Sequence, residues 1–361
     1  MGKKIEELRS KIDDIDESIV SLLEERVGIV RDIGKIKADD GVGMYDPMRE
    51  QEILSRLAGK SALDQGFIMK VYREIIGYCR GDERKIKRKD SKAKPKKKLE
   101  GGSVGVLGPA GTFTEQAAKK IFKGAKLTYC EGVDEIFRKV EAGEVGHGVV
   151  AIENSLEGSV GKTMEALIEY DVYIVGELTL DINLCLMTHE ETERIDVILS
   201  HPHALAQCSG YLRENYPEAR QVSSKSTAAA MKELVGYENA AAIGYAQAAE
   251  TYGLKIVGEN IQDDFSQTRF IVISKGKISG GKTSIIFAVK DEPGALYAIL
   301  AKFADKNINL TKIESRPSKR KLGEYLFFMD FENKGLGGRE VNTVIESVKS
   351  NTTFIKILGS Y

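Results

Sequence analysis

A long apolar stripe, uninterrupted by proline, constrains the fold of the N-terminal part of this chain more than any other feature. Apolar residues recur there at steps of three and four, a period that places them on one face of an α-helix. A helix from Ile5 to Lys37 would be about 50 Å long at 1.5 Å per residue. Such a rod is too long to fold back within a small domain, so it needs a partner helix. The stripe comprises Ile5, Leu8, Ile12, Ile15, Ile19, Leu22, Ile29, Ile33 and Ile36.

Two further helices and a charged segment follow this stripe. Asp46-Pro47 is typical of an N-cap followed by the first residue of a helix. Asp64 precedes a third helix, which we expect to end close to Gly81. Lysine and arginine then dominate residues 84–98, a composition that indicates a solvated linker. A nucleic-acid-binding tail is the alternative, but no aromatic residue is interleaved with the charges, and the formal net charge of the chain is only -1.

The remainder of the chain divides into an α/β part and an α+β part. Apolar runs of strand type alternate with helical ones over residues 103–278, which predicts two α/β lobes. From residue 283 the order is strand, helix, strand, strand, helix, strand, which is the ferredoxin-like arrangement (βαββαβ). We therefore expect a multidomain protein with a helical domain at 1–88, a basic linker at 89–102, a two-lobed α/β domain at 103–278 and a removable tail domain at 283–361.

The cysteines and the apolar runs indicate a cytoplasmic location. No apolar run is long enough to span a bilayer, and the N-terminus lacks the apolar core of a signal peptide. The four cysteines are scattered without CxxC spacing, so neither a disulfide framework nor a zinc site is expected. We expect no membrane partner and no metal.

Cationic residues beside the apolar stripe indicate an anion site that needs two chains. Arg26 and Lys37 are eleven residues apart, which returns to nearly the same helix face about 16 Å away, so both can reach one small dianion. Arg9 lies about 25 Å from Arg26 along the same helix. If Arg9 serves such a pocket, the pocket belongs to a second copy, and we expect at least a homodimer.

The motifs around these cations resemble the all-helical chorismate mutases over the first quarter of the chain. The matching segments are Leu8-Arg9, Glu25-Arg26, Gly34-Lys35-Ile36-Lys37 and Asp46-Pro47-Met48-Arg49-Glu50. The resemblance implies that Arg26, Lys37 and Arg9 of the partner subunit bind the carboxylates of chorismate. It places Asp46, Arg49 and Glu50 at the hydroxyl side, Cys79 at a substrate contact, and Lys37 and Glu83 as donors to the breaking ether oxygen. Glu83 can donate only when it is protonated.

Polar clusters after predicted strands resemble the prephenate dehydratases over residues 103–276. The matching segments are Gly108–Thr114, Ile152–Ser155, Ser200–Cys208, Ser226–Ala228 and Thr268–Phe270. The resemblance implies that Asn154, Ser200, Gln207 and Thr268 are catalytic, that Glu153 lies at the site, and that Ser226 and Thr227 bind the side-chain carboxylate of prephenate. Thr268 is a poor acid alone, so it requires a donor network to protonate a leaving hydroxide. No organic cofactor is expected.

The tail resembles the ACT domains of these enzymes. Its segments Gly294-Ala295-Leu296 and Glu314-Ser315-Arg316-Pro317 match the family pattern. The resemblance implies that phenylalanine binds between two such domains, with these two segments as the walls of the pocket, and regulates the dehydratase.

Three other interpretations remain open from the sequence. The chain could be a dehydratase alone, with a degenerate helical domain that only dimerises. It could be a non-catalytic sensor of a small ligand, although the joint presence of Asn154 and Thr268 disfavours this. The helical domain could also act as an isochorismate-pyruvate lyase.

Overall fold

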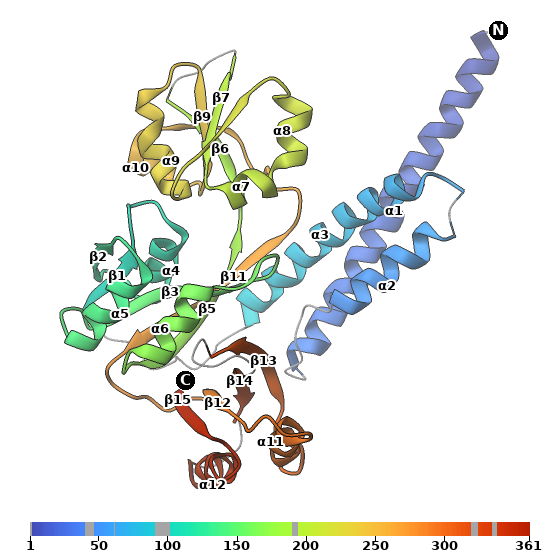
Figure 1. Cartoon of the computed structure of the whole chain (residues 1–361). Helices are drawn as coiled ribbons and strands as arrows, with labels where there is room; N and C mark the ends of the chain where they lie inside the picture. The colour runs from blue at the N-terminus through green and yellow to red at the C-terminus, as the bar shows by residue number, and fades with distance from the viewer. Residues whose placement is uncertain are drawn as a thin grey trace. The chain divides into compact units, whose positions relative to one another are not determined.

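The computed structural model describes residues 2–39, 47–60, 62–90, 102–189, 194–318, 324–333 and 338–361. The chain divides into two compact units, Met1–Lys98 and Leu99–Tyr361 (Figure 1). Among the helices that the structure describes, none is both long and apolar enough to cross a membrane.

The first unit, called the helical unit below, is all α and consists of α1 (Gly2–Asp39), α2 (Pro47–Ala58) and α3 (Gln65–Asp90). The predicted start of α3 is confirmed, because the Asp64 carboxylate accepts a hydrogen bond from the Phe67 N–H at 2.8 Å. The predicted end close to Gly81 is wrong, because α3 continues to Asp90 and includes the first residues of the expected linker. Lysine, arginine and glutamate are good helix formers, and one glycine costs only about 1 kcal/mol.

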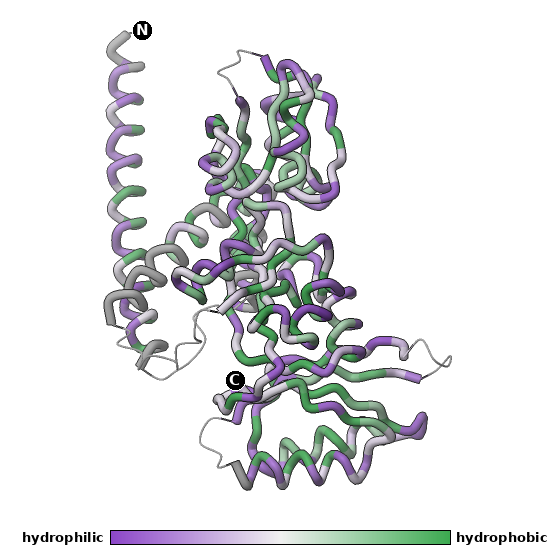
Figure 2. The backbone as a smooth tube through the Cα atoms, turned by 90° about the vertical axis from the view of Figure 1, so that its left-hand side faces the viewer, coloured by the Kyte–Doolittle hydropathy of each residue, from purple (hydrophilic) through white to green (hydrophobic). Residues whose placement is uncertain are grey.

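The apolar stripe of α1 is exposed within one chain. The N-terminal half of α1 extends beyond α2 and α3 (Figure 1), and hydrophobic turns alternate with hydrophilic ones along it (Figure 2). From Leu8 to Ile36, the exposed fractions of the stripe residues lie between 43% for Ile33 and 64% for Leu22. An apolar face this long and this exposed is typical of a surface that another helix covers.

The second unit begins with an α/β lobe, called the first lobe. Its sheet has the order β2-β1-β3-β11-β5, with β4 paired to β3. Parallel pairs join β1 to β2 and β3, whereas β11 is antiparallel to both of its neighbours. The elements are β1 (Ser103–Leu107), α4 (Phe113–Ile121), β2 (Lys126–Cys130), α5 (Val133–Ala142), β3 (His147–Asn154), β4 (Gly158–Ser159), α6 (Gly161–Glu169), β5 (Tyr173–Ile182) and β11 (Ser266–Ser274).

The second lobe is built on a sheet of order β10-β6-β9-β7-β8, in which β7 is parallel to β8 and β9. Two helices follow β7 in place of one, because the backbone leaves helical geometry at Cys208 and Asp263 accepts the backbone N–H groups of Gly210 and Tyr211 at the new helix start. The elements are β6 (Cys185–Thr188), β7 (Val197–Ser200), α7 (Pro202–Gln207), α8 (Ser209–Asn215), β8 (Arg220–Ser223), α9 (Thr227–Glu233), the 3₁₀ helix η1 (Leu234–Gly236), β9 (Ala240–Gly244), α10 (Ala248–Tyr252) and β10 (Lys255–Gly258).

The tail domain has the predicted βαββαβ order. It consists of β12 (Lys282–Ala288), α11 (Ala295–Ala304), β13 (Leu310–Pro317), β14 (Tyr325–Glu332), α12 (Gly338–Lys349) and β15 (Phe354–Ser360), with the sheet order β13-β14-β12-β15. One face of this sheet buries Phe287 and Phe331 under α11 and α12. The opposite face buries Ile286, Phe328 and Leu358 in the same core as residues of the first lobe. The tail domain and the first lobe therefore share a hydrophobic core.

Candidate functional sites

Arg26 and Cys79 meet on facing helices in the helical unit. An Arg26 Nη1 donor lies 2.8 Å from the Cys79 sulfur, and Cys79 is buried. A hollow of about 780 Å³ opens beside this contact, and it is lined by Val20, Leu23, Glu24, Val27, Arg31, Ile75, Tyr78 and Cys79. The structure thus brings together two of the residues expected at the mutase site. It also places Arg31 of α1, a cation that the sequence comparison did not single out, in the lining of this hollow.

The other residues expected at this site are exposed, paired with another side chain, or outside the described residues. Arg9 is exposed on α1, and Arg49 pairs with Glu52 at 2.6 Å near the start of α2. Asp46 and the side chains of Lys37, Glu50 and Glu83 lie outside the described residues, although the backbone of Glu83 continues α3 one turn beyond Cys79.

In the second unit, the end of β3 and the start of β11 bring Asn154 and Thr268 together as a cross-strand pair. The Asn154 Nδ2 donates to the Thr268 hydroxyl at 2.9 Å and to the Ser266 hydroxyl at 3.0 Å. The Asn154 Oδ1 accepts the backbone N–H groups of Leu156 at 2.9 Å and Glu157 at 3.2 Å. These two backbone donors fix which end of the amide is the nitrogen. Because an amide N–H₂ can only donate, Thr268 must accept here, and its own proton is left for another acceptor.

The second lobe places its polar residues at the carboxyl ends of parallel strands, where ligands bind in α/β folds. Ser200 ends β7, is fully buried, and donates to the Ile243 carbonyl at 2.7 Å. Ser226 caps α9, because its hydroxyl oxygen accepts the Ala229 N–H at 3.0 Å. Thr227 is the first residue of that helix. The proton of Ser200 is therefore used within the sheet, whereas Ser226 keeps a hydroxyl proton to donate.

Glu157 links the two lobes. Its carboxylate accepts the Gln207 side-chain amide at 3.1 Å and contacts the Nδ1 of His203, so the loop after Asn154 is tied to α7. On the other side of the junction, the Tyr252 hydroxyl donates to the Ala110 carbonyl at 2.8 Å. The catalytic candidate Gln207 is thus oriented by the loop that follows Asn154.

The loop before α4 is held by a buried carboxylate. Glu115 accepts the Gly111 N–H at 2.6 Å and pairs with Lys119 at 2.5 Å. This anchors Phe113, whose ring lies 5.4 Å from that of Tyr245 in the second lobe. Gly111 has a φ of +86°, and an added Cβ would lie 3.1 Å from the Cβ of Ala248, so glycine is required at this close approach.

Glu153 lies on the face of the first-lobe sheet opposite to Asn154. Its carboxylate pairs with Lys312 at 3.1 Å and approaches Arg269 at 3.6 Å. Glu153, expected at the prephenate site, therefore contacts the tail domain.

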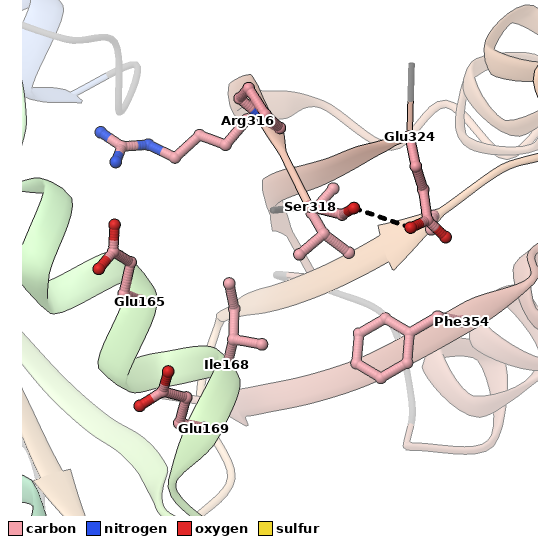
Figure 3. Close-up of a pocket in the computed structure, with 10 residues that line it drawn as sticks. Glu165, Ile168, Glu169, Arg316, Ser318, Glu324 and Phe354 are labelled. Carbon is pink, nitrogen blue, oxygen red and sulfur yellow. Dashed lines mark hydrogen bonds between the residues drawn. The ribbon is translucent and has the colours of Figure 1, made fainter. Parts of the chain in front are cut away.

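The two segments of the tail expected to bind phenylalanine line separate hollows within one chain. Ala295 and Leu296, the first two residues of α11 after the N-cap Gly294, line a hollow of about 440 Å³. Arg316 and Pro317 line another of about 470 Å³, together with Glu165, Ile168 and Glu169 of α6 (Figure 3).

Glu314, Ser315 and Arg316 alternate along the edge strand β13, with Ser315 exposed. The Glu314 carboxylate accepts hydrogen bonds from Ser159 of the first lobe and from Arg316. Burial raises the pKa of Glu314, but these hydrogen bonds and Lys312 outweigh it, so the net pKa lies below its ordinary value.

Besides Arg31, three residues at these sites escaped the sequence comparison: Ser266, Glu157 and Glu115. Ser266 is two residues before Thr268, so the alternation of a β-strand would have placed it on the same face. Glu157 lies two residues after the matched Ile152–Ser155 motif. No comparable signal marks Glu115. Among the described residues, no group of histidine, cysteine, aspartate or glutamate could hold a metal ion.

The comparisons with known proteins cover both units. The profile of chorismate mutase type II matches residues 8–84, that of prephenate dehydratase matches 104–278, and that of the ACT domain matches 283–337. The bifunctional chorismate mutase/prephenate dehydratase of Aquifex aeolicus is 39% identical, with 99% of this chain and 98% of the relative aligned. The enzyme of the same name from Pseudomonas aeruginosa is 35% identical over 99% of this chain and 97% of its own length.

A solved structure resembles the second unit. The prephenate dehydratase from Arthrobacter aurescens, determined in complex with L-Phe, is 34% identical, with a TM-score of 0.65 over 72% of this chain and 89% of its own. With three domain families in order and a relative aligned over nearly the full length, the chain belongs to the family of bifunctional chorismate mutases/prephenate dehydratases.

Proposed function

We propose that this chain catalyses two successive reactions at two separate sites. The helical unit rearranges chorismate to prephenate, and the junction of the two lobes converts prephenate to phenylpyruvate, CO₂ and water. The full-length likeness to bifunctional relatives supports both activities over a dehydratase with a degenerate helical domain and over a non-catalytic sensor. The observation that carries the dehydratase assignment is the Asn154–Thr268 pair.

Thr268 is the proposed proton donor to the departing ring hydroxyl of prephenate. The Asn154 amide donates to the Thr268 oxygen at 2.9 Å and therefore turns the Thr268 proton away from itself. Donation into the hydroxyl oxygen also stabilises negative charge that develops there as the proton leaves, which makes the threonine a better acid. Loss of the ring carboxylate as CO₂ supplies the electron pair that completes the aromatic ring as hydroxide departs.

Binding of the side-chain carboxylate of prephenate is assigned to the second lobe. Ser226 and Thr227 place hydroxyl groups at the start of α9, where the backbone N–H groups also point outward. Ser200, with its proton committed to Ile243, holds the adjoining strand edge in place. A pocket that grips this carboxylate and solvates the ring carboxylate poorly favours decarboxylation.

A matched pair of variants at residue 268 tests this assignment. Thr268→Val keeps the shape of the side chain and removes the hydroxyl, whereas Thr268→Ser keeps the hydroxyl. With prephenate as substrate, we expect Thr268→Val to lose roughly a hundredfold or more in kcat, the range of a lost general acid, and Thr268→Ser to retain most of it. Equal activities of the two variants would remove Thr268 as the donor.

The mutase site is proposed to form between two copies of the chain. Chorismate would be bound by Arg26 and Lys37 of one subunit and by Arg9 of the partner subunit, with Asp46, Arg49 and Glu50 on the hydroxyl side. Lys37 and a protonated Glu83 would donate to the ether oxygen, and Cys79 would be a further substrate contact. The exposed apolar stripe of α1 supports a dimer, because covering it with a second helix removes that surface from water. The enzyme then folds the substrate into the reactive conformer and stabilises the charge on the ether oxygen.

Phenylalanine is the proposed regulator, bound by the tail domain. Ala295 and Leu296 line one hollow and Arg316 and Pro317 line another within one chain, so we expect a pocket walled by both segments to need a second tail domain. The complex of the Arthrobacter relative with L-Phe supports this ligand.

The four cysteines are buried and unpaired, which supports the cytoplasmic location expected from the sequence.

A further inference from the structure

Two adjacent strands of the first lobe carry a pair of residues on each face of the sheet. Successive residues of a strand point to opposite faces. Thr268 lies opposite Asn154 in the register of β11 and β3, and the next pair is Arg269 opposite Glu153. The first pair forms the proposed dehydratase site, and the second pair lies on the face that packs against the tail domain.

The Arg269 guanidinium is held by groups from both domains. Its Nε donates to Glu177 of β5 at 2.7 Å. On the tail side, an Nη1 lies 2.7 Å from the Asp330 carboxylate and an Nη2 donates to the Tyr361 hydroxyl at 2.9 Å. The side chain is only 12% exposed. Burial lowers the pKa of Arg269, but Asp330, Tyr361 and Glu177 raise it by more, so the guanidinium stays charged.

The tail-side partners are themselves fixed. Ser284 donates to Asp330 at 2.5 Å and shares a hydrogen bond with the Tyr361 hydroxyl at 2.8 Å. Strand β15 lies so close to β5 that a Cβ added to Gly359 would be 2.1 Å from the Ile174 carbonyl oxygen. A displacement of the tail sheet must therefore move Asp330 and Tyr361 together and act on Arg269.

We propose that Arg269 is a positioning residue for the dehydratase reaction, through which Asp330 and Tyr361 of the tail domain hold Thr268 in register with Asn154. The proposal rests on the dehydratase function assigned above. Through Arg269, the position of the tail domain would affect the position of the Thr268 hydroxyl. Arg269 and Thr268 share one peptide unit, so a shift of the guanidinium is transmitted to the Thr268 backbone without an intervening flexible segment. Misplacement of a catalytic group by about 1 Å can cost on the order of a hundredfold in rate.

The variant Asp330→Asn tests this proposal in the full-length chain. It removes the tail-side charge while leaving Glu177 and Glu153 to neutralise Arg269, so the guanidinium is not left buried without an anion. Lys356→Met is the matched control. Lys356 also joins the two domains, but its ammonium group donates to the carbonyls of Ile168 and Tyr170, at the end of α6 and not on β3 or β11.

We expect Asp330→Asn to lower the dehydratase kcat roughly tenfold and to leave the KM for prephenate and the mutase kcat/KM within about twofold. Lys356→Met should leave the dehydratase kcat within about twofold. In a Thr268→Val background the effect of Asp330→Asn should vanish, because the hydroxyl that it positions is absent. Tyr361→Phe, which removes one hydroxyl only, should also lower the dehydratase kcat. It serves as the test variant if Asp330→Asn does not fold.

Three outcomes would overturn the proposal: an unchanged kcat in both Asp330→Asn and Tyr361→Phe, equal losses in Asp330→Asn and Lys356→Met, or a loss that persists in full without the Thr268 hydroxyl. A Thr268→Val enzyme with normal activity would instead refute the dehydratase assignment itself, so the two failures are distinguishable.

Discussion

Replacement of Asn154 by aspartate should make the Thr268 hydroxyl donate to residue 154, so that its proton is no longer available to the substrate. An aspartate keeps the two acceptor contacts to the backbone N–H groups of Leu156 and Glu157, so the loop should retain its shape. The second carboxylate oxygen, however, takes the place of an N–H₂ that lies 2.9 Å from the Thr268 oxygen. Because an ionised carboxylate can only accept, the Thr268 hydroxyl would turn and donate to it.

The expected loss follows from this reversal. The wild-type enzyme donates one hydrogen bond toward the oxygen on which charge develops, and removal of one such donor costs ~3 to 4 kcal/mol, or about 10²- to 10³-fold in kcat. Ser266→Ala is the matched control, since it removes the second acceptor of the Asn154 amide and leaves the contact with Thr268. We expect that control to lose less than about tenfold, the range of an ordinary hydrogen bond.

The assay is phenylpyruvate formation from prephenate across a range of pH, with prephenate formation from chorismate as an internal control of folding. Protonation of the new aspartate restores a donor at residue 154, so the activity of Asn154→Asp should recover in part as the pH falls, opposite to a simple loss of stability in acid. A dehydratase kcat of Asn154→Asp close to that of the wild type at neutral pH would refute the proposed direction of the Asn154–Thr268 hydrogen bond.

Three further outcomes are expected. Phe328→Ala, in the core shared by the tail domain and the first lobe, should lower the free energy of unfolding by about 3 to 5 kcal/mol in denaturant. The tail domain and the first lobe should still unfold in one transition, and separate transitions would contradict a shared core. The pKa of Glu314 is lower in the folded state than in the unfolded chain, so the unfolded chain binds more protons between the two pKa values. The stability that Glu314 contributes is therefore present above its unfolded pKa. It is lost as the pH falls through the folded pKa. Glu314→Gln should flatten this acid-side loss of unfolding free energy, and an identical slope would exclude the ion pair as its source. Mixed Arg9→Ala and Arg26→Ala subunits should regain up to about a quarter of the normal mutase sites, because one pocket of each heterodimer carries both lesions; no recovery after subunit exchange would argue against a shared pocket.

Local patterns predicted much of this fold. The α/β alternation over residues 103–278, the cap at Asp64 and the order of the tail elements all follow from short-range periodicity and capping chemistry. The strands β4, β8 and β10 and the helix α10 are two to five residues long, which is too short for a periodic pattern to mark them in the sequence. Composition was misleading at the end of α3, where the basic residues that suggested a linker are also good helix formers.

The candidate site shows the same division. Family motifs picked out Asn154 and Thr268, and the strand register brings them into contact. Nothing local indicated that Glu153 and Arg269, one residue away, serve the tail domain instead, because that contact joins segments far apart in the sequence. The sequence also contained no sign that the tail shares a core with the first lobe, so it predicted a removable domain, whereas deletion of the tail would take Ile286, Phe328 and Leu358 out of that shared core.

One measurement tests the two-site account most directly: chorismate is supplied to the Thr268→Val enzyme while prephenate and phenylpyruvate are followed separately. The account predicts that chorismate is consumed at the wild-type rate, that prephenate accumulates, and that phenylpyruvate is nearly absent. Loss of both reactions in a folded enzyme, or phenylpyruvate formed at the wild-type rate, would contradict it.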